Sequence, residues 1–184
     1  GGTVWIDAEL TSPYAFHQFF LNAEDAKVID YLKVFTFRSR EEIEELERAT
    51  EAAPFKRAAQ KALADDVTDL VHGAAEREAA VRAAGALFGR GELGELSIPS
   101  LDGVMSEVGG VAIDEPIPFA DAMALAGVVD SKSAARRTVK EGGAYLNNEK
   151  VTDADQLLDA SSLLHGRYAV IRRGRRTVGG VYLS

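Results

Sequence analysis

The pair Gly142-Gly143 marks a switch from helix to strand, and this switch limits the possible folds more than any other feature of the sequence. The segment 132–141 before the pair favours a helix, and Ser131 is suited to cap its first turn. Glycine ends helices readily because it adopts positive φ without strain. The chain is therefore expected to leave this helix at the glycines and to continue directly into extended structure.

A second helix and a hairpin complete this stretch. Gly127 can end a short helix over residues 120–126, which precedes the helix just described. After the glycine pair, two short strand segments flank Asn147-Asn148, and asparagine tolerates the positive φ that a tight hairpin turn requires. Residues 119–151 therefore predict two helices followed by a β-hairpin.

The helix over residues 132–141 is expected to have one cationic face. At about 100° per residue its four cations fall within an arc of roughly 140°, and small or apolar residues fill the opposite side. Such a face is either simply solvated or binds a polyanion. Two alternating segments, 167–172 and 177–183, flank a further basic turn. The candidate polyanion-binding cations are Lys132, Arg136, Arg137, Lys140, Lys150, Arg172, Arg173, Arg175 and Arg176.

Three strings in this stretch resemble the RNA-binding module named after the fourth protein of the small ribosomal subunit. They are S-K-S-x-A-R-R from Ser131, K-x-G-G from Lys140 and L-N-x-E-K-V from Leu146. Asn148 stands where glycine is commoner in that module, and asparagine can adopt the same conformation. The resemblance implies that the polyanion is RNA and that the nine cations contact it.

The composition of the chain permits two small globular domains. Its 184 residues are 46% hydrophobic and 27% charged, which is enough to form a core. No run approaches the roughly 18 apolar residues of a membrane span, so we expect no membrane contact. The absence of cysteine excludes disulfides and thiolate metal sites, and the three histidines lie too far apart in sequence to suggest a cluster. We expect no metal site, and a cytoplasmic location fits.

The formal net charge of −8 hides a difference between two parts of the chain. Residues 121–184 contain ten Lys/Arg and seven Asp/Glu, a balance of +3, which leaves 11 basic and 22 acidic residues, or −11, for residues 1–120. Phosphate binding depends on local positive potential rather than on the charge of the whole chain. An RNA partner is therefore compatible with the acidic total.

The first part of the chain is expected to be helical. Seven of the fourteen aromatic residues of the whole chain lie between Tyr14 and Phe37, which predicts a helical core, with a cofactor or base-stacking platform as the alternative. Asn22 to Asp25 break this run, and a second helix is expected to start at Asp25.

Three further helical segments are expected after it. Ser39 and Glu42 have the spacing of a capping box. A long amphipathic helix is predicted from an apolar stripe between Phe55 and Val71, with the neighbouring acids Asp65 and Asp66 on its solvated face. An alanine-rich helix is then expected over residues 75–87.

Glycine and proline punctuate residues 89–118, which we interpret as a linker with one short helical possibility at 101–108. The predicted fold class is mainly α, with a small α+β C-terminal domain whose sheet is small and either mixed or antiparallel. The predicted division is a remnant of a preceding domain at 1–12, a helical domain at 13–88, the linker at 89–118 and the RNA-binding module at 119–184.

The segments in their order resemble the C-terminal half of bacterial tyrosyl-tRNA synthetases, from Gly1 to Ser184. Matching strings include G-G-T-V-W-I-D, T-S-P-Y-A-F-H-Q-F-F-L-N, Y-L-K-V-F-T-F, A-D-D-V-T-D-L-V-H-G and G-R-Y-A-V-I-R-R-G. In that family the K-M-S-K-S-type loop lies immediately before the position of Gly1, and the H-I-G-H-type motif lies further upstream. We therefore expect residues 1–12 to follow the catalytic loop, and we expect no catalytic residue in this chain.

The resemblance implies a role in tRNA recognition. Residues 13–88 would form the anticodon-binding domain, and the terminal module would bind the anticodon stem and long variable arm of tRNA(Tyr). The parent enzyme would attach L-tyrosine to tRNA(Tyr) with ATP and magnesium, as a homodimer through a catalytic domain that is missing here. The chain by itself is expected to be an inactive monomer without a cofactor.

Asp25 is the one candidate for reading a base. It matches the family's acidic residue that accepts hydrogen bonds from N1 and N2 of a guanine at the first anticodon position, and a carboxylate offers two acceptors to those donors. The alternative is that Asp25, beside Glu24, only favours the N-terminus of its helix.

Two other functions are compatible with the residues. One is a self-sufficient RNA-binding or ribosome-associated protein with the same terminal module, although the long aromatic helical segment has no place in it. The other is a helical protein-interaction domain whose basic face binds an acidic partner. Salt-dependent binding to tRNA, compared with binding to an acidic protein, distinguishes them.

Overall fold

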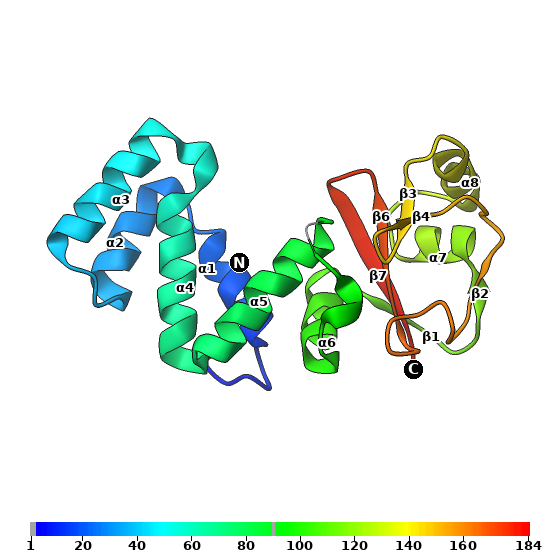
Figure 1. The fold of residues 1–184 in the computed structure, drawn as a ribbon, viewed down its shortest axis with the longest axis horizontal. Helices are drawn as coiled ribbons and strands as arrows, with labels where there is room; N and C mark the ends of the chain where they lie inside the picture. The colour runs from blue at the N-terminus through cyan, green and yellow to red at the C-terminus, as the bar shows by residue number, and fades with distance from the viewer. Residues whose placement is uncertain (1–2, 90) are drawn as a thin grey trace. The chain divides into compact units, whose positions relative to one another are not determined.

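The computed structural model describes residues 3–89 and 91–184, so Gly1 and Gly2 of the first matching string lie outside the described residues. The chain forms two compact units, unit 1 over Gly1–Val81 and unit 2 over Arg82–Ser184 (Figure 1). The division falls within helix α5, Ala74–Leu87. As divisions of function, the bounds 1–12, 13–88, 89–118 and 119–184 stay a prediction.

Unit 1 is built of helices, as the aromatic and capping patterns predict. Ser12 caps the first helix by accepting a hydrogen bond from the Ala15 amide, and Ser39 and Glu42 form the predicted capping box. Phe16, Leu32 and Leu63 pack in its core. Its elements are α1 Pro13–Leu21, α2 Asp25–Phe35, α3 Arg40–Ala52, the 3-10 helix η1 Pro54–Lys56, α4 Ala58–His72 and the first part of α5.

The long amphipathic helix is shorter than its apolar stripe suggests. Phe55 lies in η1 with 82% of its surface exposed, and Arg57 adopts a left-handed conformation with φ of 51° before α4 begins. Pro54 and this left-handed residue interrupt the helix, because neither continues the regular hydrogen-bond pattern. Phe37 also departs from the expected core: α2 has ended at Phe35, and Phe37 is 94% exposed.

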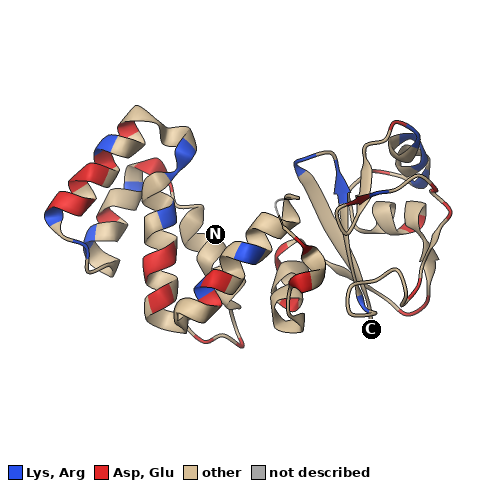
Figure 2. Ribbon diagram, viewed as in Figure 1, with Lys and Arg blue, Asp and Glu red and all other residues tan. Residues whose placement is uncertain are grey.

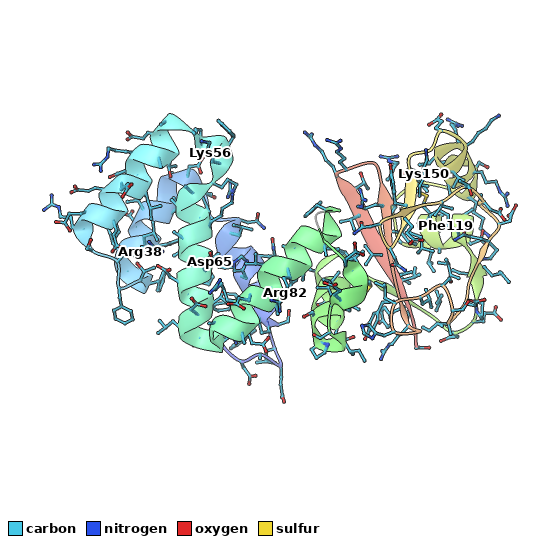
Figure 3. The ribbon with its side chains drawn as sticks, in the orientation of Figure 1. Arg38, Lys56, Asp65, Arg82, Phe119 and Lys150 are labelled. Atoms are coloured by element: carbon cyan, nitrogen blue, oxygen red, sulfur yellow. The ribbon has the colours of Figure 1, made fainter. Side chains whose placement is uncertain are left out.

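Asp65 and Asp66 lie on a partly exposed side of α4, with side chains 41% and 28% exposed, but both also have partners outside this helix. Asp65 accepts a hydrogen bond of 2.8 Å from the buried His17 ring, and Asp66 accepts two from Arg38 at 2.6 and 2.9 Å (Figure 3). These acids tie α4 to α1 and to the segment after α2. Sequence spacing gives no sign of such partners, because the pairs lie 48 and 28 residues apart.

Unit 2 combines a mixed sheet with helices, which confirms the predicted fold class. The five-stranded sheet has the order β1-β7-β6-β3-β4, in which β1 and β7 are parallel and all other neighbours are antiparallel, and β2 pairs with β5 separately. The remaining elements after α5 are η2 Leu93–Glu95, α6 Ile98–Glu107, β1 Val111–Ile113, β2 Ile117–Pro118, α7 Phe119–Leu125, α8 Lys132–Lys140, β3 Ala144–Leu146, β4 Glu149–Lys150, β5 Leu157–Leu158, β6 Tyr168–Arg173 and β7 Thr177–Leu183.

Two glycines in β7 let helices approach both faces of this sheet. A Cβ on Gly179 would lie 2.6 Å from the carbonyl oxygen of Ala126, directly after α7, and one on Gly180 would lie 2.5 Å from the sulfur of Met105 in α6. Successive strand residues point to opposite faces. The end of α7 therefore packs on one face and α6 on the other, and Phe119 of α7 is completely buried in the core (Figure 3).

The described part of segment 89–118, which we expected as a linker, holds packed structure. Leu101 and Val104 of α6 are completely buried, and β1 extends the sheet through its pairing with β7. The hydroxyl of Tyr168 donates a hydrogen bond of 2.7 Å to Asp102 of α6. Glycine and proline mark the turns of this segment rather than an extended connection. Among the described residues, no helix is both long and apolar enough to cross a membrane.

Candidate nucleic-acid interface

Helix α8 has the ends that the sequence predicts. The Ser131 hydroxyl accepts a hydrogen bond of 3.2 Å from the Ala134 amide at the start of the helix. At its end Gly142 has a φ of 72°, and its amide donates to the carbonyl of Val139 at 2.9 Å. Ala135 is buried, whereas the four cations of the helix are exposed. The cationic face therefore points away from the core.

The hairpin after α8 is closed by the two asparagines, as predicted. Asn147 and Asn148 have φ values of 51° and 70°. The Asn147 side chain accepts a hydrogen bond of 2.8 Å from the Val170 amide, and the Asn148 side chain donates one of 2.6 Å to the carbonyl of Ala86. The turn is thus held against β6 and against the end of α5.

Lys150 of β4 reaches back to the end of α8. A Cβ on Gly142 would lie only 2.6 Å from the Lys150 ammonium nitrogen, so this side chain lies directly against the glycine. The carbonyl end of a helix carries partial negative charge, which favours a cation there. Lys150 is exposed and lies on the same end of α8 as Lys140.

The sheet brings the basic turn between β6 and β7 to this end of α8. Arg173 pairs with Ala144 in the ladder, and the Gly174 amide donates a hydrogen bond of 2.8 Å to the carbonyl of Gly143. Figure 2 shows the basic residues on α8 and at the β6–β7 turn. A hollow of about 550 Å³ lies between the two segments, and it is lined by Ala134, Arg137, Thr138, Glu141, Gly143, Arg173 and Gly174.

Two cations of α8 already have acidic partners. The Lys132 ammonium lies 2.7 Å from Asp121 of α7. Arg136 donates two hydrogen bonds to Asp155, at 2.8 and 2.5 Å, and these bonds lower the pKa of the Asp155 carboxyl and raise the pKa of Arg136. Of the candidate cations, the exposed ones without an acidic side chain in contact among the described residues are Arg137, Lys140, Lys150, Arg173, Arg175 and Arg176.

Arg172 differs from the other candidate cations because it is buried, with only 7% of its surface exposed. Its guanidinium stacks over the Tyr145 ring at 4.7 Å and donates hydrogen bonds to the carbonyl of Gly174 and to the Asn148 side chain, at 2.6 and 3.2 Å. This placement argues against the expectation that Arg172 contacts RNA directly. The strand pattern foresaw its position but not the aromatic ring that covers it.

Asp25 is exposed in the first turn of α2, where Glu24 is the cap residue and makes no side-chain capping bond. One Asp25 oxygen accepts a hydrogen bond of 2.5 Å from the amide of Gln60, which is completely buried in α4. Gln60 and Arg57 also donate to the carbonyl of Ala23, at 3.3 and 3.0 Å. The carboxylate is therefore oriented from behind by a neighbouring helix.

Sequence reasoning missed Gln60 and the two acids that pair with α8. Gln60 sits next to the apolar stripe of α4 at a position that the fold buries, and a polar residue there was the available signal. Asp121 and Asp155 gave no such signal, because they approach α8 only through the fold. Among the described residues, no group of three or more histidine, aspartate or glutamate side chains could hold a metal ion.

Comparisons with known proteins decide which family carries this arrangement. The family model "tRNA synthetases class I (W and Y)" matches residues 1–89, and the model "Tyrosine--tRNA ligase SYY-like C-terminal domain" matches residues 101–178. The tyrosine–tRNA ligase of Cutibacterium acnes is 58% identical over 182 residues, or 98% of this chain. The chain belongs to the tyrosine–tRNA ligase family.

A second curated relative agrees with this assignment. The tyrosine–tRNA ligase of Streptomyces coelicolor is 52% identical over 184 residues, which is 100% of this chain. The chain spans 44% of the length of each of these two relatives. A C-terminally truncated mitochondrial tyrosyl-tRNA synthetase from Coccidioides posadasii, a solved structure, is 39% identical over 43% of this chain and 22% of its own, with a TM-score of 0.42.

Proposed function

We propose that this chain is the tRNA-recognition portion of a tyrosine–tRNA ligase and that its partner is tRNA(Tyr). The observation that carries the proposal is the convergence of unpaired cations from α8 and from the β6–β7 turn at one end of the helix. A cluster of this kind suits a chain of phosphates, because each neutralised phosphate releases counterions. The relatives' names supply the enzyme class, and the cation cluster supports an RNA-binding role for this part.

Within that role, phosphate contacts would position the RNA. We assign them to the exposed candidate cations of unit 2 without an acidic partner, Arg137, Lys140, Lys150, Arg173, Arg175 and Arg176, whereas Lys132 and Arg136 can contact a phosphate only by giving up Asp121 and Asp155. We assign to Arg172 the task of holding the hairpin and the basic turn together through Tyr145 and Gly174. Such contacts fix orientation and shape but carry little information about base identity.

Base identity would be read in unit 1 by Asp25. Its carboxylate is exposed, and Gln60 orients one of its oxygens. The Asp25 side chain therefore loses less conformational entropy when it binds a guanine. A guanine edge offers two N–H donors, and the two carboxylate oxygens match them as acceptors. The anticodon stem and the long variable arm would then lie on the terminal module.

For the whole enzyme we propose the attachment of L-tyrosine to tRNA(Tyr) with ATP and magnesium, in a cytoplasmic homodimer. This chain alone would be a monomer that binds tRNA but does not activate tyrosine. Tyrosine-dependent exchange between ATP and pyrophosphate, measured with the purified chain, tests the second statement directly. Exchange above background would contradict it.

Binding to tRNA is tested by titrating the chain with tRNA(Tyr), with an anticodon-swapped tRNA and with an acidic protein of similar charge density. We expect tRNA binding whose logarithm falls linearly with the logarithm of salt concentration, with a slope of about −0.7 to −0.9 for each phosphate contacted. Equal binding to the acidic protein would support a protein-interaction domain instead.

Asp25→Ala separates base reading from positioning. We expect an unchanged salt slope but a loss of discrimination between the two tRNAs worth about 1–3 kcal/mol, because the guanine donors lose a charged acceptor. Glu24→Ala is the matched control, since Glu24 is exposed and adjacent but makes no side-chain capping bond. Equal discrimination by the Asp25 variant and the wild type would remove Asp25 from the anticodon contact.

A further inference from the structure

The cationic face of α8 is divided along its circumference. Counted from Lys132 at about 100° per residue, Arg136 lies near 40°, Lys140 near 80° and Arg137 near 140°. Lys132 and Arg136 are the two cations of this face that contact acids. The residues that line the hollow beside the basic turn begin at Arg137 and continue around the helix to Ala134 and Thr138. One edge of the face is therefore paired, and the other opens onto Arg173.

The paired edge is held by acids from two other segments. Asp121 lies in α7, and its side chain is 28% exposed. Asp155 lies in the loop before β5, and its amide donates a hydrogen bond of 2.9 Å to the side chain of Asp153. Both Asp121 and Asp153 also raise the pKa of Arg136 through their charges. The negative field on this edge thus comes from three carboxylates.

The open edge has a different balance. Arg137 and Arg173 line the hollow, and Gly143 and Gly174 leave its floor without side chains. Glu141 is the one acidic residue among its described lining residues, and Lys140 lies on the same end of the helix. Arg175 and Arg176 extend the exposed positive charge along the turn.

We propose that Asp121 and Asp155 exclude RNA phosphates from the first half of α8 and confine the phosphate path to Arg137, Lys140 and the β6–β7 turn. This inference rests on the proposed RNA-binding function and refines it. The two acids are thereby specificity-determining residues: they weaken binding to RNA that would lie along the whole helix, and they leave the path across its end unaffected.

The physical reason is a competition between two anions for one guanidinium. A phosphate that binds Arg136 has to displace the two-point contact with Asp155, so it exchanges one charge-assisted pair for another. It also leaves an unpaired carboxylate beside the RNA. Since exposed ion pairs are weak, the exclusion is a bias of a few fold rather than a complete block.

We expect substitutions of the two neighbouring arginines to change the salt dependence of binding by different amounts. In the wild type, Arg137→Ala should reduce the magnitude of the salt slope for tRNA(Tyr) binding by about 0.7 to 0.9, the value for one phosphate, whereas Arg136→Ala should change it little. Asp155→Asn should raise the affinity for a non-specific single-stranded RNA about two- to fivefold, with a smaller gain for tRNA(Tyr). In the Asp155→Asn background, Arg136→Ala should abolish that gain.

Asp130→Asn is the control for the change in net charge. Asp130 is exposed next to the cap of α8, and no cation contacts it among the described residues. Thermal unfolding of every variant shows that unit 2 remains folded at the temperature of the titration. Equal slopes for the two arginine variants, or equal effects of Asp155→Asn and Asp130→Asn, would overturn the inference and leave the proposed function standing. Salt-independent or absent tRNA binding by the wild type would overturn both.

Discussion

The charged side chains of unit 1 and unit 2 differ in what many of them contact. In unit 1 ion pairs connect separate segments or join neighbouring turns of one helix. Arg38 pairs with Asp66, His17 with Asp65, Arg77 with Asp69 and Arg40 with Glu44. In unit 2 the exposed cations at the end of α8 and in the basic turn have no acid in contact among the described residues. The acidic total charge of the chain therefore says little about its partner, because the unpaired charge is what a polyanion meets.

The two units also differ in the groups that they present to the proposed RNA partner. Unit 1 presents an acceptor, Asp25, oriented by a buried glutamine. Unit 2 presents donors, the guanidinium and ammonium groups around α8. Acceptors suit the donor edges of bases, whereas cations suit phosphates.

The largest effect is expected from Arg172→Ala, which should lower the free energy of unfolding of unit 2 by about 3 kcal/mol. The variant loses charge-assisted hydrogen bonds and a ring contact in a buried place. Arg173→Ala is the matched control, because Arg173 is the exposed neighbour of Arg172. This substitution should change the free energy of unfolding by less than about 0.5 kcal/mol but weaken RNA binding. Denaturant unfolding measures the difference. Equal stability of the two variants would mean that Arg172 does not hold the hairpin.

A smaller effect is expected from Gly142→Val, about 1–2 kcal/mol on unit 2. Gly142 has a φ of 72°, which a β-branched residue adopts only with strain, and the new side chain would also displace Lys150. Gly142→Asn is the control, because asparagine tolerates this conformation better while also bringing a Cβ against Lys150. Thermal unfolding measures the difference. If both variants unfold at the same temperature as the wild type, the helix end does not require a left-handed residue.

The smallest effects on stability at neutral pH are expected from two ionisable side chains with shifted pKa values, Tyr168 in unit 2 and His72 in unit 1. Burial, followed by the hydrogen bond to Asp102, raises the pKa of Tyr168 from 10.0 to about 12. Because the folded pKa is the higher one, this contribution to the stability of unit 2 is complete below pH 10 and is lost as the pH rises toward 12. Tyr168→Phe should remove that alkaline loss, measured by chemical denaturation at several pH values.

Unit 1 should respond at the acid side instead. Burial lowers the pKa of His72, whose ring lies edge-on to Phe16 at 4.8 Å. A depressed folded pKa means that stability is complete above the ordinary value of 6.5 and is lost as the pH falls below it. His72→Phe should reduce the loss of stability of unit 1 at low pH and leave the loss of stability of unit 2 at high pH unchanged. An unaltered loss at low pH would show that His72 does not control it.

What the sequence predicted in each unit depends on how far apart the interacting residues lie. The capping box at Ser39 and Glu42 and the helix end at Gly142 follow from neighbours within a few positions, and the structure confirms both. The parallel pairing of Val111 with Val181 joins residues 70 positions apart, and nothing in either segment indicates the other. Patterns of local spacing determine helices and turns, whereas pairing between strands depends on the whole fold.

The candidate site shows the same limit. The cations of α8 could be placed on one face from periodicity alone, because helix geometry fixes their angles. Their partners could not be foreseen: Asp155 lies 19 residues from Arg136, and Gln60 lies 35 residues from Asp25. The ring of Tyr145 under Arg172 is a cross-strand contact between β3 and β6, which depends on the strand register.

The position of β7 between β1 and β6 has a consequence for anyone who dissects this chain. A piece cut at residue 119 would keep every candidate phosphate-binding cation but lose β1, and β7 would become an edge strand with unpaired amides and carbonyls. It would also lose α6, which covers the face at Gly180. Long uncovered edges recruit other strands and lead to aggregation. Truncated forms that contain unit 2 should therefore begin before α6, so that the new edge is not mistaken for a property of the proposed RNA-binding surface.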